Sequence, residues 1–346
     1  MLMKRRIFLI SGLLLLFAAA GLLFLAQKDA VAPTVTSNEP GSFEPEVKKL
    51  DPLEIEAIRS RAYISSDIIT EQTLNPSATH QSSVISYTSD GLKVYALLSV
   101  PSSARPADGW PVIILNHGYI NPAQYQTTGP EYAGFISAFT KAGYLVIKPD
   151  YRGHGKSQGS PEGGHFSPVY TYDILNLIES LKKFALVNPA RIGTLGHSLG
   201  GHLSLRVAVV SEDVKATSIM AGVVGSMNDL FYNWPRSPIP YDQPATLVRS
   251  KKAELVEKYG EPKDNPDFWN RASAINYVDS IVGPVQVNHD ELDSNVPKIF
   301  SDHLVDALNK AGKKYEYHLY PGDDHQFAAN RSALLKNILN FYRANL

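Results

Sequence analysis

The chain has 346 residues, 44% hydrophobic and 19% charged, a composition typical of a globular protein with a substantial core. Its formal net charge is −1, so it lacks the overall basic field that would attract nucleic acid. The chain contains no cysteine, which excludes disulfides, thiolate metal sites and a cysteine nucleophile.

The N-terminal segment predicts a membrane anchor over residues 1–26. Lys4, Arg5 and Arg6 precede an uncharged apolar run from residue 7 to residue 26. As a helix this run would extend about 30 Å, roughly the hydrocarbon thickness of a bilayer. A cleavable signal peptide is the alternative, but its apolar core is usually shorter. The positive residues favour a cytoplasmic N-terminus, so we expect the rest of the chain to be extracytoplasmic, or secreted if the segment is cleaved.

Residues 27–50 contain three prolines and show no hydrophobic periodicity, which predicts a linker. We expect one folded domain over residues 51–346. Within it, residues 225–271 interrupt the regular pattern with several prolines and with Phe231, Trp234 and Trp269. Because long irregular segments inside compact domains are usually functional, we interpret this insertion as a small lid over the active-site edge.

Short apolar runs alternate with helical patterns from about residue 83 onward. Residues 84–87 and 92–100 flank Ser89-Asp90-Gly91, a sequence typical of a tight turn, and predict an antiparallel pair. Six further runs are rich in Val, Ile, Leu and Tyr, and most are nearly continuous, as in strands buried on both faces of a parallel sheet. These six runs are residues 112–115, 144–147, 192–195, 217–220, 285–287 and 315–320. The alternation predicts a doubly wound, mostly parallel α/β sheet.

A nucleophile elbow is the strongest motif. Gly196-His197-Ser198-Leu199-Gly200 follows the run 192–195 and precedes a helical stretch at 203–210, which is the G-x-S-x-G pattern in its expected context. The turn between strand and helix is tight, so the flanking positions must lack Cβ atoms. The pattern therefore predicts Ser198 as a nucleophile at the carboxyl end of a strand.

A serine hydroxyl is a weak nucleophile and needs an adjacent base. In folds with this elbow, the acid and then the histidine follow the serine along the chain. The run 285–287 leads into a segment with Asp290, Glu291 and Asp293, and the run 315–320 leads into His325. These two segments supply the candidate acid and base.

Five stretches together resemble the α/β-hydrolase superfamily, and within it the catalytic domain of the prolyl oligopeptidase family and the dienelactone hydrolase and acetyl xylan esterase-like proteins. They are Asn116-His117-Gly118, residues 150–157, the Ser198 elbow, residues 293–297 and Asp324-His325. The resemblance implies His325 as the base and, through the D-x-x-V-P stretch of residues 293–297, Asp293 as the acid. The family often has glycine after the preceding histidine, where this chain has Asp290, so Asp290 and Glu291 are the alternative acids.

The catalytic template then assigns the remaining roles. The oxyanion of an acyl-transfer intermediate needs donors placed in advance, each often worth about 3–4 kcal/mol. We expect the backbone N–H of Leu199 and that of Tyr119, with the Tyr119 hydroxyl as an alternative to the latter. No cofactor is required and no metal site is expected, since His289 lacks a cluster of further ligands.

Four other polar residues receive structural roles: His117 shapes the oxyanion loop, His154 packs a loop, His202 is structural in the helix after the elbow, and Arg152 ties loops together by hydrogen bonds.

The sequence thus predicts a serine hydrolase that cleaves carboxylic esters, or short peptides or amides, through an acyl-serine intermediate. Only about 80 residues precede the core, so we expect this chain to lack the β-propeller that prolyl oligopeptidases usually carry, and this expectation favours an esterase-like activity. A prolyl oligopeptidase-like peptidase is one alternative. A non-catalytic binding protein is another, but the presence of Ser198, Asp293 and His325 argues against it. The expected partners are a small ester or peptide substrate and the membrane, not nucleic acid.

Overall fold

A computed structural model describes residues 50–346, apart from residues 163, 235–244 and 323. Residues 49–346 form one compact unit. The described strands build one mixed sheet in the order β1-β2-β3-β5-β4-β6-β7-β8-β9. The strands are β1 Ile69–Thr73, β2 His80–Ser89, β3 Leu92–Pro101, β4 Trp110–Asn116, β5 Leu145–Pro149, β6 Val187–His197, β7 Val214–Met220, β8 Val285–Asp290 and β9 Tyr315–Tyr320.

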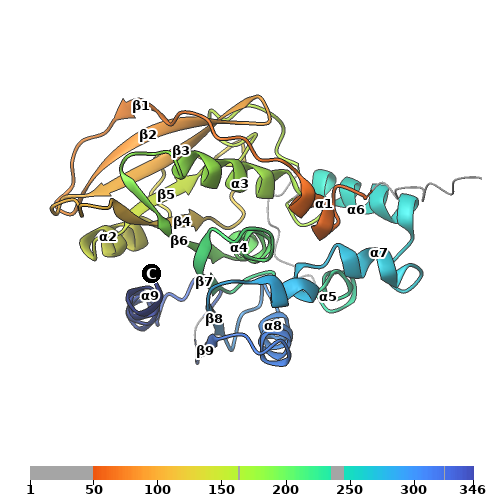
Figure 1. Ribbon diagram of the computed structural model, residues 1–346. Coiled ribbons are helices and arrows are strands. Elements are labelled where there is room, and N and C mark those ends of the chain that lie inside the picture. The colour runs from red at the N-terminus through yellow and green to blue at the C-terminus, as the bar shows by residue number, and fades with distance from the viewer. Residues whose placement is uncertain (1–49, 163, 235–244, 323) are drawn as a thin grey trace, which may run out of the picture. The chain divides into compact units, whose positions relative to one another are not determined.

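The described helices are α1 Ile55–Ser60, α2 Ala133–Lys141, α3 Val169–Leu181, α4 Leu199–Val210, α5 Met227–Tyr232, α6 Ala245–Tyr259, α7 Pro266–Arg271, the 3₁₀ segment η1 Ala274–Ser280, α8 Lys298–Lys310 and α9 Arg331–Asn345. Helices lie against both faces of this sheet, with α3, α4 and α8 on one face and α2 and α9 on the other, whereas α6 and α7 lie to one side of it (Figure 1). Strands β4 to β9 pair in parallel, whereas β1, β2 and β3 are antiparallel. The predicted doubly wound, mostly parallel α/β sheet is therefore confirmed.

The hairpin between β2 and β3 closes through Asp90 and Gly91. Both residues have positive φ, 53° and 77°, and Ser89 pairs with Leu92. Two positive φ values are the signature of a type I′ turn, whose twist matches that of the flanking strands. The tight turn predicted from Ser89-Asp90-Gly91 is thus confirmed, and it fixes the register of the antiparallel end of the sheet.

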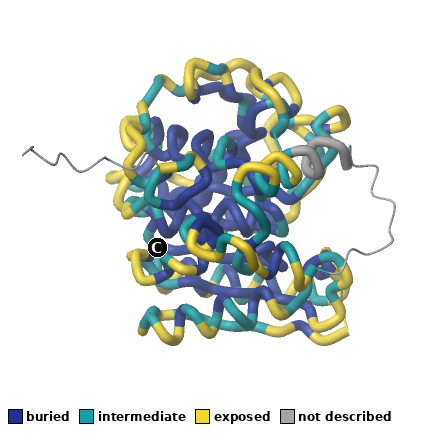
Figure 2. The backbone as a smooth tube through the Cα atoms, turned by 90° about the vertical axis from the view of Figure 1, so that its right-hand side faces the viewer, coloured by how far each residue is buried: buried dark blue, intermediate teal, exposed yellow. Residues whose placement is uncertain are grey.

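Two apolar cores lie on the two faces of the sheet. In β4, Val112 and Ile114 face the core formed with α3, α4 and α8, whereas Ile113 and Leu115 face the core formed with α2 and α9. Side chains alternate along a strand, so a strand covered on both faces must be apolar at every position. All seven residues of β4 are buried, and Figure 2 shows the buried segments in the interior of the domain.

Each of the six apolar runs that predicted parallel strands falls on one of strands β4 to β9, with only Tyr144 lying outside its strand, β5. Strand β1 was not predicted, because its sequence, Ile-Thr-Glu-Gln-Thr, is polar and all five residues are exposed. The insertion at 225–271 contains α5, α6 and α7, and residues 235–244 within it lie outside the described part.

The predicted anchor, residues 1–26, and the predicted linker, except its last residue, also lie outside the described residues. Within the described part of the chain, no helix has the combined length and apolar character needed to cross a bilayer.

Candidate active site

The elbow between β6 and α4 has the strained backbone that the motif predicts. Ser198 has φ 54° and ψ −116°, a conformation that side-chain-bearing residues rarely adopt. A Cβ added to Gly196 would lie 2.2 Å from the carbonyl oxygen of Gly200, and one added to Gly200 would lie 1.8 Å from that of Asn116. Both glycines are therefore required by backbone contacts, which hold the serine at the carboxyl end of β6.

The loop after β4 packs directly against the nucleophile. A Cβ added to Gly118 would lie 3.3 Å from Cβ of Ser198 and 3.3 Å from Nδ1 of His197. The N–H of Gly118 donates to the hydroxyl of Tyr132 at 2.8 Å. This loop is therefore close enough to Ser198 to supply an oxyanion donor.

The surrounding hydrogen bonds bear on the two expected oxyanion donors, Leu199 and Tyr119. Leu199 is the first residue of α4, and the first N–H groups of a helix lack intrahelical acceptors. Because Tyr132 occupies the Gly118 N–H, the N–H of Tyr119 is the next backbone donor in the loop. The Tyr119 hydroxyl, the alternative donor, is buried and has no hydrogen-bond partner among the described residues, and burial raises its pKa.

His325 and Asp293 form a buried pair after β9 and β8. Nδ1 of His325 lies 2.7 Å from Oδ2 of Asp293, and the Asp293 side chain is fully buried. Oδ1 of the same carboxylate accepts the backbone N–H groups of Asn295 and Val296 at 2.8 and 2.9 Å. Burial alone would raise the pKa of Asp293, but the bonds from His325 and these two N–H groups outweigh it and hold the pKa below its usual value.

The two alternative acids have other environments. Oδ1 of Asp290 accepts the backbone N–H of Leu292 at 2.7 Å, and Glu291 is exposed at the surface. The structure thus brings Asp293, of the three candidate acids, into hydrogen-bond contact with His325.

His325 also lies against the elbow. Its backbone carbonyl is 2.9 Å from Nε2 of His197, the residue before Ser198, and the two imidazole rings are 4.8 Å apart. Among the described residues, the Ser198 hydroxyl and the His325 ring form no hydrogen bond. Such bonds are often long without substrate and tighten in the reactive complex. The nucleophile, base and acid therefore gather at the same edge of the sheet.

The three histidines and the arginine that received structural roles are all buried. His117 is fully buried and stacks between Tyr125 and Tyr151, with ring centroids 4.8 and 4.3 Å away. Arg152 pairs with Asp173 at 2.6 Å and with Asp90 at 2.9 Å, and so ties the β2–β3 turn to α3. The prediction that Arg152 joins loops is confirmed.

The remaining histidines also have structural environments. His154 packs edge-on against Tyr125 and Tyr151. His202 in α4 bonds through Nδ1 to the carbonyl of Val223 at 3.1 Å. Of the described residues, no group of three or more His, Cys, Asp or Glu side chains is arranged to hold a metal ion.

The insertion at residues 225–271 contacts the loop after β8 that carries Asp293, here called the acid loop. Nε1 of Trp234 donates to the carbonyl of Asn295 at 2.7 Å, two residues after Asp293, and its ring lies edge-on to His165. Trp269, by contrast, is 1% exposed and packs within the insertion against Phe231 and Phe268. Of these two tryptophans, Trp234 is thus the one that contacts the acid loop.

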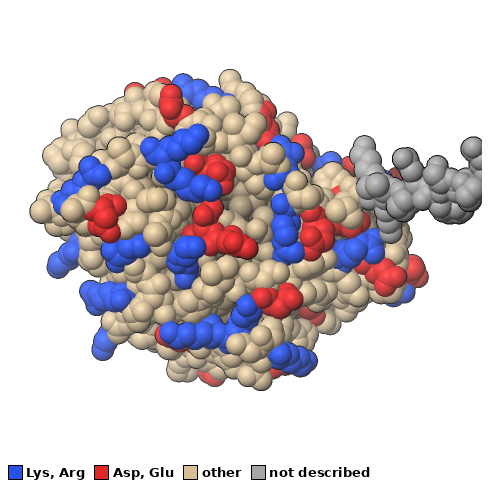
Figure 3. Space-filling view, viewed as in Figure 1, with Lys and Arg blue, Asp and Glu red and all other residues tan. Residues whose placement is uncertain are grey.

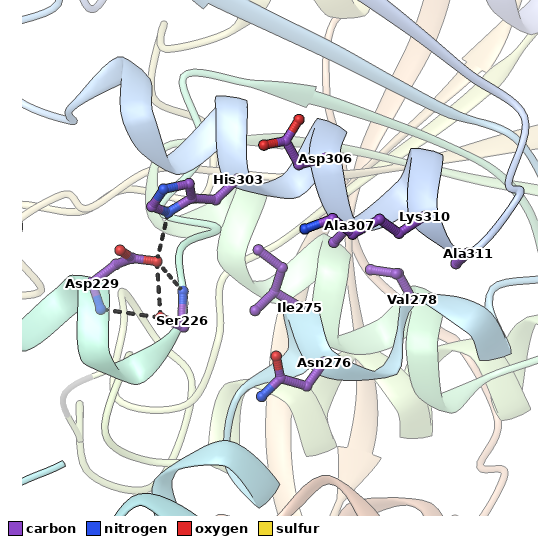
Figure 4. Close-up of a pocket in the computed structure, with 10 residues that line it drawn as sticks. All are labelled: Ser226, Asp229, Ile275, Asn276, Val278, His303, Asp306, Ala307, Lys310 and Ala311. Carbon is purple, nitrogen blue, oxygen red and sulfur yellow. Dashed lines mark hydrogen bonds and ion pairs between the residues drawn. The ribbon is translucent and has the colours of Figure 1, made fainter. Parts of the chain in front are cut away.

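A surface cavity of about 540 Å³ lies elsewhere, between η1 and α8 (Figure 4). Asp229 there accepts hydrogen bonds from Ser226, Asn233 and His303, which cap α5 and join it to α8. None of the proposed catalytic residues lines this cavity. On the face in Figure 3, cationic and anionic side chains are interspersed.

Comparison with known proteins decides the family. Residues 130–346 match the prolyl oligopeptidase family, peptidase S9. The chain belongs to the prolyl oligopeptidase family. It is therefore a serine hydrolase with an α/β-hydrolase fold, as the sequence predicts.

Three relatives illustrate the range of this family and fold. The chain is 26% identical to "Uncharacterized peptidase YtmA" of Bacillus subtilis, over 70% of this chain and 85% of that protein. It is 23% identical to "Dipeptidyl aminopeptidase BIII" of Pseudoxanthomonas mexicana, over 63% of this chain but only 30% of that protein. The structure of an acetyl xylan esterase from Paenibacillus sp. R4 superposes with a TM-score of 0.62 at 17% identity, over 84% of this chain and 92% of the esterase.

Sequence reasoning missed two residues of the site, Tyr132 and His197. His197 stood in the motif, but its ring was given no role there. Nothing in the sequence distinguishes Tyr132, whose hydroxyl bonds both Gly118 and His197.

Proposed function

We propose that this prolyl oligopeptidase family member hydrolyses small carboxylic esters or short peptides with Ser198 as nucleophile, His325 as base and Asp293 as acid. The observation that carries the proposal is the 2.7 Å contact between the buried Asp293 carboxylate and His325, beside the strained elbow of Ser198. Buried carboxylate–imidazole pairs next to a nucleophile are the arrangement that activates a serine.

The Asp293 contact determines which ring nitrogen can act. A carboxylate only accepts hydrogen bonds, so Nδ1 of His325 carries the proton and Nε2 is free to accept one. Nε2 takes the proton of Ser198 as Oγ bonds to the substrate carbonyl carbon. The carbonyl oxygen becomes an oxyanion that accepts from the N–H groups of Leu199 and Tyr119.

The acyl-enzyme then forms and is hydrolysed. His325 passes its proton to the departing alcohol or amine as the carbonyl re-forms on Ser198. Water next attacks the ester, again losing its proton to Nε2, and the carboxylic acid leaves as Ser198 regains its proton. Asp293 holds the ring orientation and stabilises the imidazolium in both halves of the reaction.

The substrate class follows from two supports. The chain covers most of an acetyl xylan esterase and most of the peptidase YtmA, so both ester and peptide bonds are candidate substrates. The indole of Trp234 beside the acid loop favours substrates with an apolar or aromatic acyl group. We propose esters of such acids as the first choice and short peptides as the second.

We also propose that residues 1–26 anchor the protein in a membrane with the catalytic domain outside the cytoplasm. The support is the uncharged run of residues 7–26 after three positive residues. Alkaline carbonate extraction of membranes tests the anchoring, and protease accessibility in intact cells tests the side.

The test of the catalytic proposal is labelling of the full chain with a fluorophosphonate, followed by peptide mapping. We expect one label at Ser198, and none in Ser198→Ala. Activity is then measured against p-nitrophenyl esters of graded chain length and against dipeptidyl p-nitroanilides. A folded wild-type protein that takes up no label at Ser198, or a Ser198→Ala variant with undiminished turnover, would contradict the proposal.

A further inference from the structure

Three hydrogen bonds, here called the relay, connect the loop after β4 to the backbone of His325, the proposed catalytic base. The part of this loop at residues 117–119 is called the oxyanion loop. The N–H of Gly118 donates to Oη of Tyr132 at 2.8 Å, and Oη lies 2.9 Å from Nδ1 of His197. Nε2 of His197 lies 2.9 Å from the carbonyl oxygen of His325. Tyr132 and His197 thus bridge the oxyanion loop and the segment that carries His325.

The donor and the acceptor in each of these three hydrogen bonds follow from the groups at the two ends of the series. A carbonyl oxygen only accepts, so the proton of His197 is on Nε2 and Nδ1 is an acceptor. Nδ1 therefore accepts the hydroxyl proton of Tyr132, whose oxygen in turn accepts the N–H of Gly118. Every donor has one acceptor, and only one tautomer of His197 satisfies all three bonds.

The backbone of Tyr132 gives independent support. Tyr132 is the N-cap residue, directly before helix α2, with φ 65° and ψ 5°, a left-handed conformation, and it makes no side-chain cap hydrogen bond. Tyrosine is a poor residue for this helix position, and the left-handed conformation is unfavourable for a residue with a side chain. Backbone strain of this kind persists where surrounding contacts require it, often at active sites. Here the strained residue delivers its hydroxyl to Gly118 and His197.

We propose that Tyr132 and His197 are positioning residues that couple the oxyanion loop to the catalytic base. Tyr132 holds the peptide between His117 and Gly118, and so limits the orientation of the next peptide, which carries the N–H of Tyr119. His197 fixes the backbone of His325, and so holds its ring between Asp293 and Ser198. This inference rests on the proposed catalytic function, because it assigns no role outside that site.

The ring of His197 remains neutral in the range where the enzyme would work. Burial, reinforced by the neighbouring His325, lowers the pKa of His197 to about 3. Protonation would place a second N–H on Nδ1, opposite the Tyr132 hydroxyl, and would reverse that bond. A neutral His197 keeps the direction of the relay unchanged.

Tyr132→Phe tests the relay with the smallest change, because it removes only the hydroxyl. We expect kcat for an ester to fall about 10- to 100-fold, with KM changed less than about twofold. The reason is that the donor to the oxyanion would be less well oriented in the transition state, whereas substrate binding would be little affected. Phe139, a buried α2 residue whose ring packs against Tyr144 and Tyr342, offers a control: Phe139→Leu should leave kcat within about twofold, since it changes packing away from Tyr132 and His197. A Tyr132→Phe enzyme with wild-type kcat would overturn the proposal.

Two amide substitutions separate the two bonds of His197. In His197→Gln the amide nitrogen lies near the former Nε2 and still donates to the His325 carbonyl. In His197→Asn the amide oxygen lies near the former Nδ1, and the bond to His325 is lost. We expect kcat of His197→Gln to exceed that of His197→Asn by about tenfold. Equal rates in the two variants would overturn the assigned role toward His325.

Nitrogen NMR of histidine in the wild-type full chain gives a readout that does not depend on activity or on variant folding. We expect His197 as a neutral ring protonated on Nε2 from about pH 5 to about pH 8. A ring protonated on Nδ1, or a charged ring, overturns the relay. If instead the wild-type chain fails to label at Ser198 while His197 shows the expected tautomer, the proposed function fails and the hydrogen-bond chain stands.

Discussion

Oδ2 of Asp293 accepts from Nδ1 of His325 at 2.7 Å, while Oδ1 of the same carboxylate accepts two backbone N–H groups of its own loop. The carboxylate therefore cannot rotate without breaking bonds, and it holds the imidazole in one orientation. This relationship joins two segments that follow β8 and β9, 32 residues apart in sequence.

Replacing Asp293 by Asn should lower kcat by roughly 10⁴-fold, because an amide can offer an N–H to Nδ1 and so favour the wrong tautomer of His325. Steady-state kinetics on a p-nitrophenyl ester measures the loss. Glu291→Gln is the matched control, since it removes a carboxylate two residues away that is exposed. A larger loss in Glu291→Gln than in Asp293→Asn would assign the acid to Glu291.

The strain at Ser198 predicts a stability difference between two inactive variants. With φ 54° and ψ −116°, residue 198 favours glycine over any residue with a Cβ. Ser198→Gly should therefore have a free energy of unfolding about 1 kcal/mol higher than Ser198→Ala, even after the entropy lost by glycine. Urea unfolding of both variants measures this. An alanine variant more stable than the glycine variant would show that the elbow stores no strain.

The sequence predicts those parts of the fold in which burial sets a regular apolar pattern or in which a tight turn requires particular residues. In β4 every residue is buried, so its apolar run has no polar interruption. The elbow requires glycine at 196 and 200 because neighbouring backbone atoms leave no room for a Cβ. The residues that meet these requirements are close together in the sequence, so Ser198 could be identified from its motif.

The features that the sequence did not predict are contacts between segments far apart in the sequence, and elements without hydrophobic periodicity. Tyr132 and His197 are 65 residues apart, and their bond exists only because the loop after β4 folds back over the elbow. The left-handed conformation of Tyr132 has no sequence signal, since tyrosine is uncommon there. Strand β1 is exposed at every position, with four polar residues after Ile69, and pairs through its backbone with β2, so hydrophobic periodicity cannot reveal it.

Asp150 should make stability depend on pH in the direction opposite to most carboxylates. It is buried, accepts hydrogen bonds from Tyr125 and Thr127, and lies near the buried Lys148. Burial raises the pKa of Asp150 to about 6, against the lowering effect of those two hydrogen bonds and of Lys148. The folded chain thus holds a proton that the unfolded chain releases near its ordinary value of 3.8.

The stability that this proton contributes is complete below about pH 4 and is lost as the pH rises through about 6, on the order of 3 kcal/mol in all. About 2 kcal/mol of this falls between about pH 4.5 and pH 7.5. Relative to Asp150→Asn, which does not titrate, the wild-type chain should lose that amount over this range. Urea unfolding of both chains at the two pH values measures it, and a wild-type chain that gains stability relative to the variant would contradict the buried, proton-binding state.

Gly200→Ala should disrupt the junction on which the elbow and the oxyanion loop both depend. The new methyl group would lie 1.8 Å from the carbonyl oxygen and 2.5 Å from the carbonyl carbon of Asn116, the last residue of β4. Both atoms are backbone, so strand and helix must separate, and we expect a loss of more than about 3 kcal/mol of stability together with fluorophosphonate labelling. Gly134→Ala is the control, since its Cβ meets no atom within 4 Å and alanine favours the α2 helix, so stability should be unchanged or about 0.5–1 kcal/mol higher. If Gly200→Ala unfolded at the same urea concentration as Gly134→Ala and labelled at the wild-type rate, the close packing of β4 against α4 could not be what holds Ser198 in place.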